Sequence, residues 1–155
     1  MFKYPVVVFE GIEASGKSTS LKKVSKYLKN INRKFISIRE PGGSFYSETI
    51  RKLILNKNSN LNFKTDLMLL MAARSENIDK ILKKNNGKKI ILIDRFIDST
   101  IAYQHFGLGI NIHLINKLNK FVLNGFKPNF TFLHIVNNKN MKKRLKNRVN
   151  LNKYD

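Results

Sequence analysis

Eight residues near the N-terminus combine two glycines, a lysine and a hydroxyl at a spacing that suits phosphate binding. The segment Gly11-Ile-Glu-Ala-Ser-Gly-Lys-Ser18 fits the pattern G-x-x-x-x-G-K-[ST], the ATP-binding P-loop. Its glycines let backbone N–H groups turn toward phosphate oxygens, Lys17 bridges the β- and γ-phosphates, and Ser18 offers a hydroxyl to Mg²⁺. We therefore predict ATP and Mg²⁺ as cofactors, with nucleotide contacts from Gly11, Ile12, Glu13, Ala14, Ser15, Gly16, Lys17, Ser18 and Thr19.

Glu13 is an unusual residue inside this loop. A carboxylate close to the phosphates of ATP is electrostatically unfavourable. It either faces solvent or contacts a sugar hydroxyl of a second substrate, and we favour the second interpretation.

A second group of reactive side chains follows an apolar segment later in the chain. Asp94-Arg95 comes directly after Lys89-Ile-Ile-Leu-Ile, and Ser99, Tyr103 and Gln104 follow within ten residues. Ligands of open parallel sheets bind at the carboxyl ends of strands. Asp94 there could hold Mg²⁺ through water while Arg95 clamps a phosphate. The alternatives are a strand-end carboxylate for Asp94 and core packing for Tyr103.

Composition makes the arginines informative. Lysine, asparagine and isoleucine crowd the chain, as AT-rich coding would produce, yet arginine persists inside the motifs at Arg39, Arg51, Arg74 and Arg95. A planar guanidinium binds phosphate with two hydrogen bonds, and lysine does not replace it. We infer that these arginines contact a ligand.

The elements that must position these residues alternate between strand and helix. Valine-rich and isoleucine-rich runs predict buried strands at 4–10, 34–39, 89–94 and 131–136. Helices are predicted between and after them, at 17–30, 47–55, 63–84, 98–106, 112–124 and 139–148. This alternation predicts a single α/β domain with a parallel sheet and helices on both faces, the three-layer P-loop NTPase fold.

Four segments together resemble the bacterial thymidylate kinases, and the similarity covers essentially the whole chain. They are Phe9–Thr19, Arg39-Glu-Pro-Gly-Gly43, Ala72-Ala-Arg74 and Asp94–Gln104. The resemblance implies transfer of the γ-phosphoryl group of ATP to dTMP. It also implies that Glu13 holds the 3′-hydroxyl and that Pro41 follows a cis peptide bond. The dTMP-binding residues implied are Glu13, Arg39, Pro41, Arg51, Leu70, Arg74, Arg95, Ser99, Tyr103 and Gln104.

Within the resemblance, Arg51 and Arg95 would contact the monophosphate and Arg74 the thymine edge. Ser99, Tyr103 and Gln104 would line the nucleoside pocket, and the Tyr103 ring would block a ribose 2′-hydroxyl. Ser18 and Asp94 would bind the Mg²⁺ ion. Ala14 stands where one branch of the family has an arginine, so this chain is similar to the branch whose catalytic arginines come from a lid. The catalytic residues implied are Lys17, Arg95, Arg148 and Lys153, with Arg144 at the start of a lid near residues 142–155.

The chain departs from the family pattern at several positions. Leu70 replaces an aromatic residue that stacks on thymine, and Leu108 replaces an arginine. Asn152-Lys153 replaces an Asp-Arg pair, so that an ammonium takes the place of a guanidinium. The sequence also stops within the lid, which predicts four strands and a missing fifth strand.

Bulk properties limit the function classes. The 155 residues contain no cysteine, which excludes disulfides and thiolate metal sites, and no segment is apolar for long enough to cross a membrane. The net charge of +20 is scattered along the chain, so we expect a solvated basic surface and no nucleic-acid partner.

The run Leu67–Ala73 is apolar on all sides, which predicts burial against the sheet and against a second subunit, a homodimer. The expected location is the cytoplasm.

These observations predict a dTMP kinase that supplies dTDP for dTTP synthesis. Two alternatives stay open. One is a P-loop kinase for another nucleotide or for a deoxynucleoside. The other is a catalytically impaired fragment or a basic nucleic-acid-binding protein on the same scaffold.

Overall fold

A parallel sheet forms the centre of the computed structural model, which describes residues 2–56 and 58–147. Its strands are β1 (Val6–Gly11), β2 (Phe35–Arg39), β3 (Ile90–Asp94) and β4 (Phe130–His134), in the order β2-β3-β1-β4. Every pairing is parallel. The predicted fold class and the four predicted strands are confirmed for the described residues, with bounds shifted by one or two positions.

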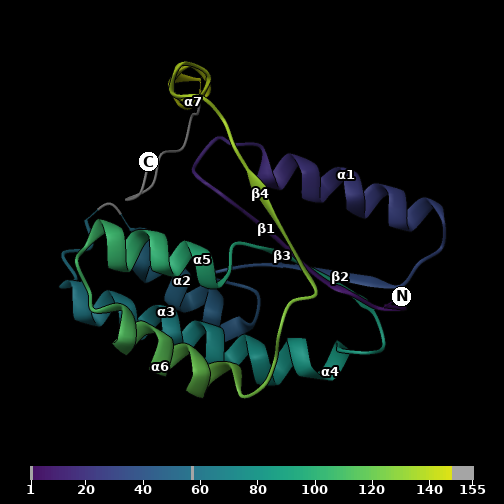
Figure 1. Ribbon diagram of the computed structural model, residues 1–155, viewed down its shortest axis with the longest axis horizontal. Coiled ribbons are helices and arrows are strands. Elements are labelled where there is room, and N and C mark those ends of the chain that lie inside the picture. The colour runs from purple at the N-terminus through teal and green to yellow at the C-terminus, as the bar shows by residue number, and fades with distance from the viewer. Residues whose placement is uncertain (1, 57, 148–155) are drawn as a thin grey trace.

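Helices cover both faces of the sheet (Figure 1). Helix α1 (Lys17–Asn30) packs on one face, where Leu28 joins a cluster with Phe9 and Leu92. The other face carries α2 (Phe45–Leu55), α3 (Phe63–Asn77), α5 (Ile97–Thr100) and α6 (Ile112–Leu123). Helix α7 (Asn138–Lys146) follows β4 and lies apart from the other helices in Figure 1.

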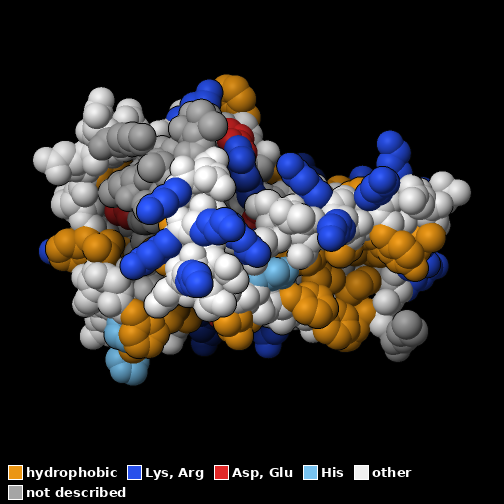
Figure 2. Space-filling model, turned by 90° about the horizontal axis from the view of Figure 1, so that it is seen from above, with side chains coloured by type: hydrophobic (Ala, Val, Ile, Leu, Met, Phe, Trp, Pro, Cys, Tyr) orange, Lys and Arg blue, Asp and Glu red, His pale blue; other side chains and the backbone are white. Residues whose placement is uncertain are grey.

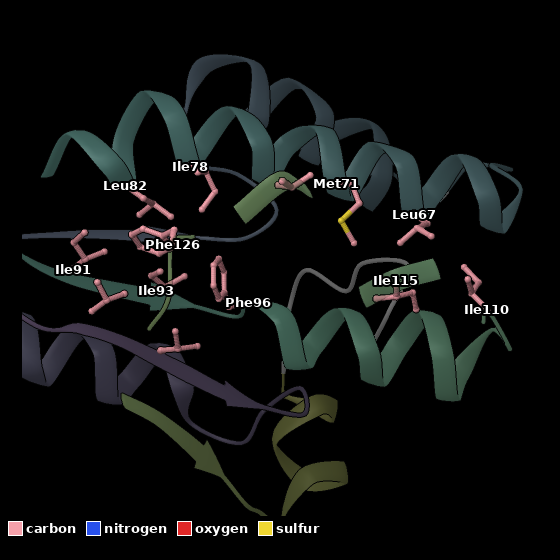
Figure 3. Packing of buried hydrophobic residues seen from close by; sticks show 13 residues of the cluster. Leu67, Met71, Ile78, Leu82, Ile91, Ile93, Phe96, Ile110, Ile115 and Phe126 are labelled. Atoms are coloured by element: carbon pink, nitrogen blue, oxygen red, sulfur yellow. The ribbon is translucent and has the colours of Figure 1, made fainter. Parts of the chain in front are cut away.

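The larger core cluster lies between the sheet and α3, α5 and α6 (Figure 3). Ile91 and Ile93 of β3 face Ile78 and Leu82 from the α3 side, and all four side chains are fully buried. Burying a side chain of this size contributes about 1.5–3 kcal/mol. This packing fixes the carboxyl end of β3, where Asp94 begins the candidate site.

Two of the predicted continuous helices contain wider turns. The helix predicted at 63–84 is α3, a π-helical segment η1 (Ile78–Leu82) and the short α4 (Lys83–Asn85). The helix predicted at 98–106 is α5 followed by a second π-helical segment, η2 (Ile101–Gly107). Such widenings occur often at functional sites, and the apolar periodicity of a sequence does not distinguish them from an α-helix.

The predicted burial of Leu67–Ala73 against the sheet is confirmed, whereas the predicted burial of its other side against a second subunit stays a prediction. Leu67, Met71 and Ala73 face the core, whereas Met68 is 50% exposed and Ala72 is also exposed. A helix resting on one sheet buries one stripe, so the opposite stripe is left to solvent.

The basic side chains form no single stripe on the face shown in Figure 2. They are spread over much of it, mostly with backbone and other side chains between them, while hydrophobic side chains gather mainly toward its lower side. This distribution agrees with the expectation of a solvated basic surface. Within residues 2–56 and 58–147, none of the helices is both long enough and apolar enough to cross a bilayer.

Candidate active site

The phosphate-binding loop lies between β1 and α1, as its motif predicts. Gly16 adopts a left-handed conformation (φ 103°) at the N-terminus of α1, and Gly11 (φ 139°) lies so close to β4 that a Cβ would collide with the backbone oxygen of His134. Lys17 is only 6% exposed, and its Nζ donates a 2.7 Å hydrogen bond to the Ile12 carbonyl inside the loop. The loop thus encloses its own cation.

Burial and neighbouring charge perturb Lys17. Desolvation, and then the positive charge of Arg95, lower the pKa of Lys17 from 10.5 to about 8, although Asp94 and Glu13 act in the opposite direction. The ammonium is therefore poorly stabilised by the protein alone. Phosphate oxygens placed beside it would supply the missing negative charge.

Two oxygen-bearing side chains meet at the mouth of the loop. Ser18 Oγ donates a 2.6 Å hydrogen bond to Asp94 Oδ2. Asp94 arrives there because β3 pairs in parallel with both β1 and β2, next to Phe9 on one side and Arg39 on the other. A hydroxyl and one carboxylate are oxygen ligands of the kind Mg²⁺ uses together with substrate phosphates, so the two residues fit that ion. Within the described residues, no cluster of three or more acidic or histidine side chains offers a protein-only metal site.

A sharp turn after Asp94 presents Arg95. Arg95 has a positive φ of 68°, a conformation that non-glycine residues adopt rarely. The turn is fastened by Glu10, which is 2% exposed and accepts hydrogen bonds from Phe96 N (2.7 Å), Ser99 N (3.2 Å) and Ser99 Oγ (2.5 Å). The carboxylate of Glu10 therefore fixes both Arg95 and Ser99 at the end of the sheet.

Glu13 faces away from the centre of the P-loop and toward this turn. Its Oε1 accepts a 2.6 Å hydrogen bond from Arg95 Nη2, and its Oε2 accepts one of 2.5 Å from the Tyr103 hydroxyl. The Arg95 guanidinium lies 5.3 Å from the centre of the Tyr103 ring. Burial, and then the bond to Glu13, raise the pKa of Tyr103, so this hydroxyl stays a donor. The ion pair with Arg95 offsets the repulsion between Glu13 and bound phosphates.

The loop after β2 adds a further cation. The Glu40–Pro41 peptide bond is cis, as the resemblance implied, and the Pro41 carbonyl accepts a 2.6 Å hydrogen bond from Arg51 Nη1. Burial, and then the nearby Arg39, lower the pKa of Arg51. Arg39 itself is more exposed and pairs with Glu48 at 3.6 Å. Arg51 and Arg39 make this edge of the cavity strongly attractive to an anion.

Asn77 fastens the same loop from the end of α3. Its side chain is fully buried, donates to the Gly42 carbonyl (2.6 Å) and accepts from the Ser44 N–H (3.1 Å). Because the loop is tied to α3 in this way, its position depends on the core beneath it.

Arg74 is the most enclosed of the predicted ligand-binding arginines, at 3% exposed. It donates from Nε to Glu40 Oε2 (2.7 Å) and from Nη1 to Asn119 Oδ1 (2.7 Å). Its Nη2 donates to the Phe96 carbonyl and to Thr100 Oγ1, both at 2.9 Å. The predicted contact between Arg74 and a base stays a prediction, and four of the five guanidinium N–H groups already have protein acceptors.

One cavity of about 630 Å³ joins these parts. Its lining includes every predicted site residue that the structure describes, except Gly11 and Ile12, which form the start of the P-loop. Leu70, Gln104, Arg74 and Phe96 all belong to this lining. The predicted catalytic residues Arg148 and Lys153 lie outside the described residues. Arg144, predicted to start the lid, donates from Nη1 to the Ala14 carbonyl of the P-loop (2.9 Å).

Sequence reasoning missed the residues that support the ligand-facing ones: Glu10, Glu40, Asn77, Thr100 and Asn119. Glu10 and Glu40 could have been found from the sequence, because the chain has only ten acidic residues and these two adjoin the motif loops. No signal marked Asn77 or Asn119, because asparagine is abundant throughout.

Comparisons with known proteins agree with this geometry. The family model for thymidylate kinase matches residues 9–155. A thymidylate kinase of Mesoplasma florum is 41% identical over 141 residues, which cover 90% of this chain and 67% of that protein. One from Thermosipho africanus is 37% identical over 143 residues, or 92% of this chain and 71% of that protein.

A solved structure shows the same arrangement of elements. The crystal structure of thymidylate kinase from Ehrlichia chaffeensis superposes with a TM-score of 0.80 at 38% sequence identity, covering 93% of this chain and 83% of that one. The cavity, its two groups of cations and these matches lead to one conclusion: the chain belongs to the thymidylate kinase family.

Proposed function

We propose that this protein is an ATP-dependent dTMP kinase, which transfers the γ-phosphoryl group of ATP to dTMP and releases ADP and dTDP. The observation that carries the proposal is the single cavity joining the P-loop to Arg51 and Arg95. A phosphotransferase needs a donor phosphate site and an acceptor phosphate site within one enclosure, so that the two phosphates meet in line.

The donor side consists of the P-loop. Backbone N–H groups of residues 13–18 and the N-terminus of α1 would bind the β- and γ-phosphates, with Lys17 beside them. Ser18 and Asp94 would hold Mg²⁺, which when bound neutralises charge on the phosphates. Lys17 would stabilise the negative charge that develops on the transferring group.

The acceptor side begins at the turn after β3. Arg95 and Arg51 would bind the monophosphate of dTMP and aim one of its oxygens at the γ-phosphorus. Glu13 would accept a hydrogen bond from the 3′-hydroxyl, and Tyr103 would close the sugar site. Because Glu13 is already bonded to both Arg95 and Tyr103, the sugar and phosphate contacts are prearranged in one connected group.

The base would lie against the deeper wall of the cavity. Leu70 and Phe96 offer apolar contact, while Arg74 and Gln104 offer polar contact. Ser99, held by Glu10, would border the nucleoside. Pro41 and Arg39 would close the edge beside the phosphate.

Arg144 supports a lid that begins in α7. It bonds to the P-loop carbonyl of Ala14 and also lines the cavity, so a cation from α7 already reaches the donor site. We propose that Arg148 and Lys153 extend this lid in a single kinase domain and supply further positive charge during transfer.

The same apolar surface that is left open in the single chain supports a homodimer. Met68 and Phe63 on α3 and Phe121 on α6 are 50%, 47% and 80% exposed, and α3 and α6 contact each other. A mass of two chains by sedimentation equilibrium is expected, and a single-chain mass at all concentrations would refute the dimer. We also propose a cytoplasmic location for the protein.

The test is a coupled ADP-release assay with dTMP, dUMP, AMP, CMP, GMP and thymidine as acceptors. We expect dTMP to give the highest kcat/KM and Lys17→Ala to abolish turnover. A preference for another acceptor would support a different P-loop kinase. A folded chain that binds dTMP and ADP but does not turn over would support the catalytically impaired alternative. Salt-sensitive binding of DNA or RNA in place of dTMP would support the basic nucleic-acid binder.

A further inference from the structure

The guanidinium of Arg74 is fixed on three sides by protein. Its Nε donates a hydrogen bond to Glu40, and the two N–H groups of Nη2 donate to the Phe96 carbonyl and to Thr100. One N–H of Nη1 donates to Asn119. The guanidinium carbon also lies 5.0 Å from the centre of the Phe96 ring. A guanidinium has five N–H groups, so one N–H on Nη1 is left for a ligand.

Asn119 contributes to this arrangement from outside the cavity. It belongs to α6, is 4% exposed and does not line the cavity wall, so it reaches Arg74 from the opposite side. Within the described residues, its Nδ2 is buried and donates no hydrogen bond. A buried donor without an acceptor destabilises a fold. The contact from Oδ1 to Arg74 is therefore the interaction that this amide provides.

We propose that Asn119 is a positioning residue that sets the base preference of the site by fixing Nη1 of Arg74. The proposal rests on the proposed function, in which Arg74 meets the base of the acceptor nucleotide. With Asn119 in place, the cavity receives a single, immobile N–H. That donor pairs with a carbonyl oxygen, which thymine has at its 4-position, and not with the amino group that cytosine has there.

Removing the Asn119 oxygen has a specific consequence. Nη1 then carries two N–H groups without a fixed partner, and the guanidinium loses its attachment to α6. A mobile N–H of Arg74 discriminates less between the carbonyl oxygen of thymine and the amino group of cytosine. Discrimination depends on how poorly the wrong group fits a fixed donor. We expect about a tenfold loss in the preference for dTMP over dCMP, the effect of one hydrogen bond at a buried site.

The experiment compares three variants of the full chain. Asn119→Leu removes the acceptor while keeping the branched shape of the side chain, and Asn119→Asp keeps an oxygen on Arg74. Ile115→Ala, at a fully buried position of the same helix, controls for loss of core packing. Dissociation constants for dTMP and dCMP are measured by calorimetry, and kcat/KM for both by ADP release.

We expect Asn119→Leu to lower the dTMP-to-dCMP ratio about tenfold in both measurements, with an unchanged KM for ATP. Asn119→Asp should retain the ratio, and Ile115→Ala should lower the melting temperature while leaving the ratio intact. The proposal is overturned if Asn119→Leu keeps the wild-type ratio, if Asn119→Asp loses it equally, or if Ile115→Ala changes it as much. Wild-type protein that binds dTMP selectively but does not phosphorylate it would refute the proposed function alone, whereas equal binding of both nucleotides by the wild type would refute the role of Asn119.

Discussion

Lys17 makes nucleotide binding depend on pH in a direction that its environment determines. In the ligand-free protein the ammonium is buried in the P-loop near Arg95, which lowers the pKa of Lys17 to about 8. Bound phosphates would restore that pKa toward its ordinary value, because they place negative charge directly beside Nζ. Binding of ADP should therefore take up a proton when the pH lies above about 8.

The magnitude follows from the fraction of protein that carries the proton. With a pKa of about 8, Lys17 is about nine-tenths protonated at pH 7 and about one-tenth protonated at pH 9. The apparent dissociation constant for ADP should rise about tenfold between these pH values. A shift from 10.5 to about 8 corresponds to about 3 kcal/mol at 1.36 kcal/mol per pKa unit, which is the cost of keeping Lys17 protonated in this buried environment.

Folding stability should change in the opposite direction. The unfolded chain binds more protons than the folded one between pH 8 and 10.5, so the contribution of Lys17 to stability is lowest below pH 8 and rises through this window. The contribution of Lys17 to folding therefore cannot account for weaker nucleotide binding at pH 9.

Calorimetric titration with ADP and Mg²⁺ in buffers of different ionisation enthalpy measures both the affinity and the proton uptake. ADP is used because it cannot be turned over. Its phosphates are fully ionised above pH 8, since their last pKa is about 6. Lys23→Met is the matched control, since Lys23 lines the same cavity but lies outside the P-loop motif, and it should keep the pH dependence. Constant affinity from pH 7 to 9, without proton uptake, would refute the reasoning.

Three further perturbations separate the parts of the site. Arg95→Ala should raise the KM for dTMP by about tenfold or more, because it removes a charge-assisted contact, and leave the KM for ATP nearly unchanged; equal losses in steady-state kinetics would contradict the division into two subsites. Asp94→Asn should raise the Mg²⁺ concentration needed for half-maximal rate, because an amide is a weaker ligand than a carboxylate, and an unchanged Mg²⁺ titration would argue against this assignment. Asn77→Ala should lower the free energy of unfolding by about 1–3 kcal/mol in urea titrations, since Gly42 and Ser44 lose buried partners; a change below about 0.5 kcal/mol would show that the loop does not depend on this amide.

Much of the fold could be predicted because its signals are local. Valine and isoleucine runs marked β1 and β3, and the glycine–lysine spacing marked the loop before α1. The two π-helical segments could not be predicted, because one added residue per turn leaves no distinct pattern in a short apolar sequence. Composition likewise shows that the helix around Met68 is apolar, but not which surfaces cover it. In the single chain the stripe at Met68 is exposed, and its burial against a second subunit stays a prediction.

The sequence by itself determined the chemistry of the ligand-facing residues. Lys17, Ser18, Asp94 and Arg95 stand in motifs whose spacing follows from the shape of a phosphate, and the cavity brings them together as expected. Only the tertiary structure decided what holds them in place. Glu10 reaches across 86 residues to the turn at Phe96, and Asn119 reaches across 45 residues to Arg74. Contacts of this kind depend on how distant elements pack, and a single sequence does not record which residues will meet.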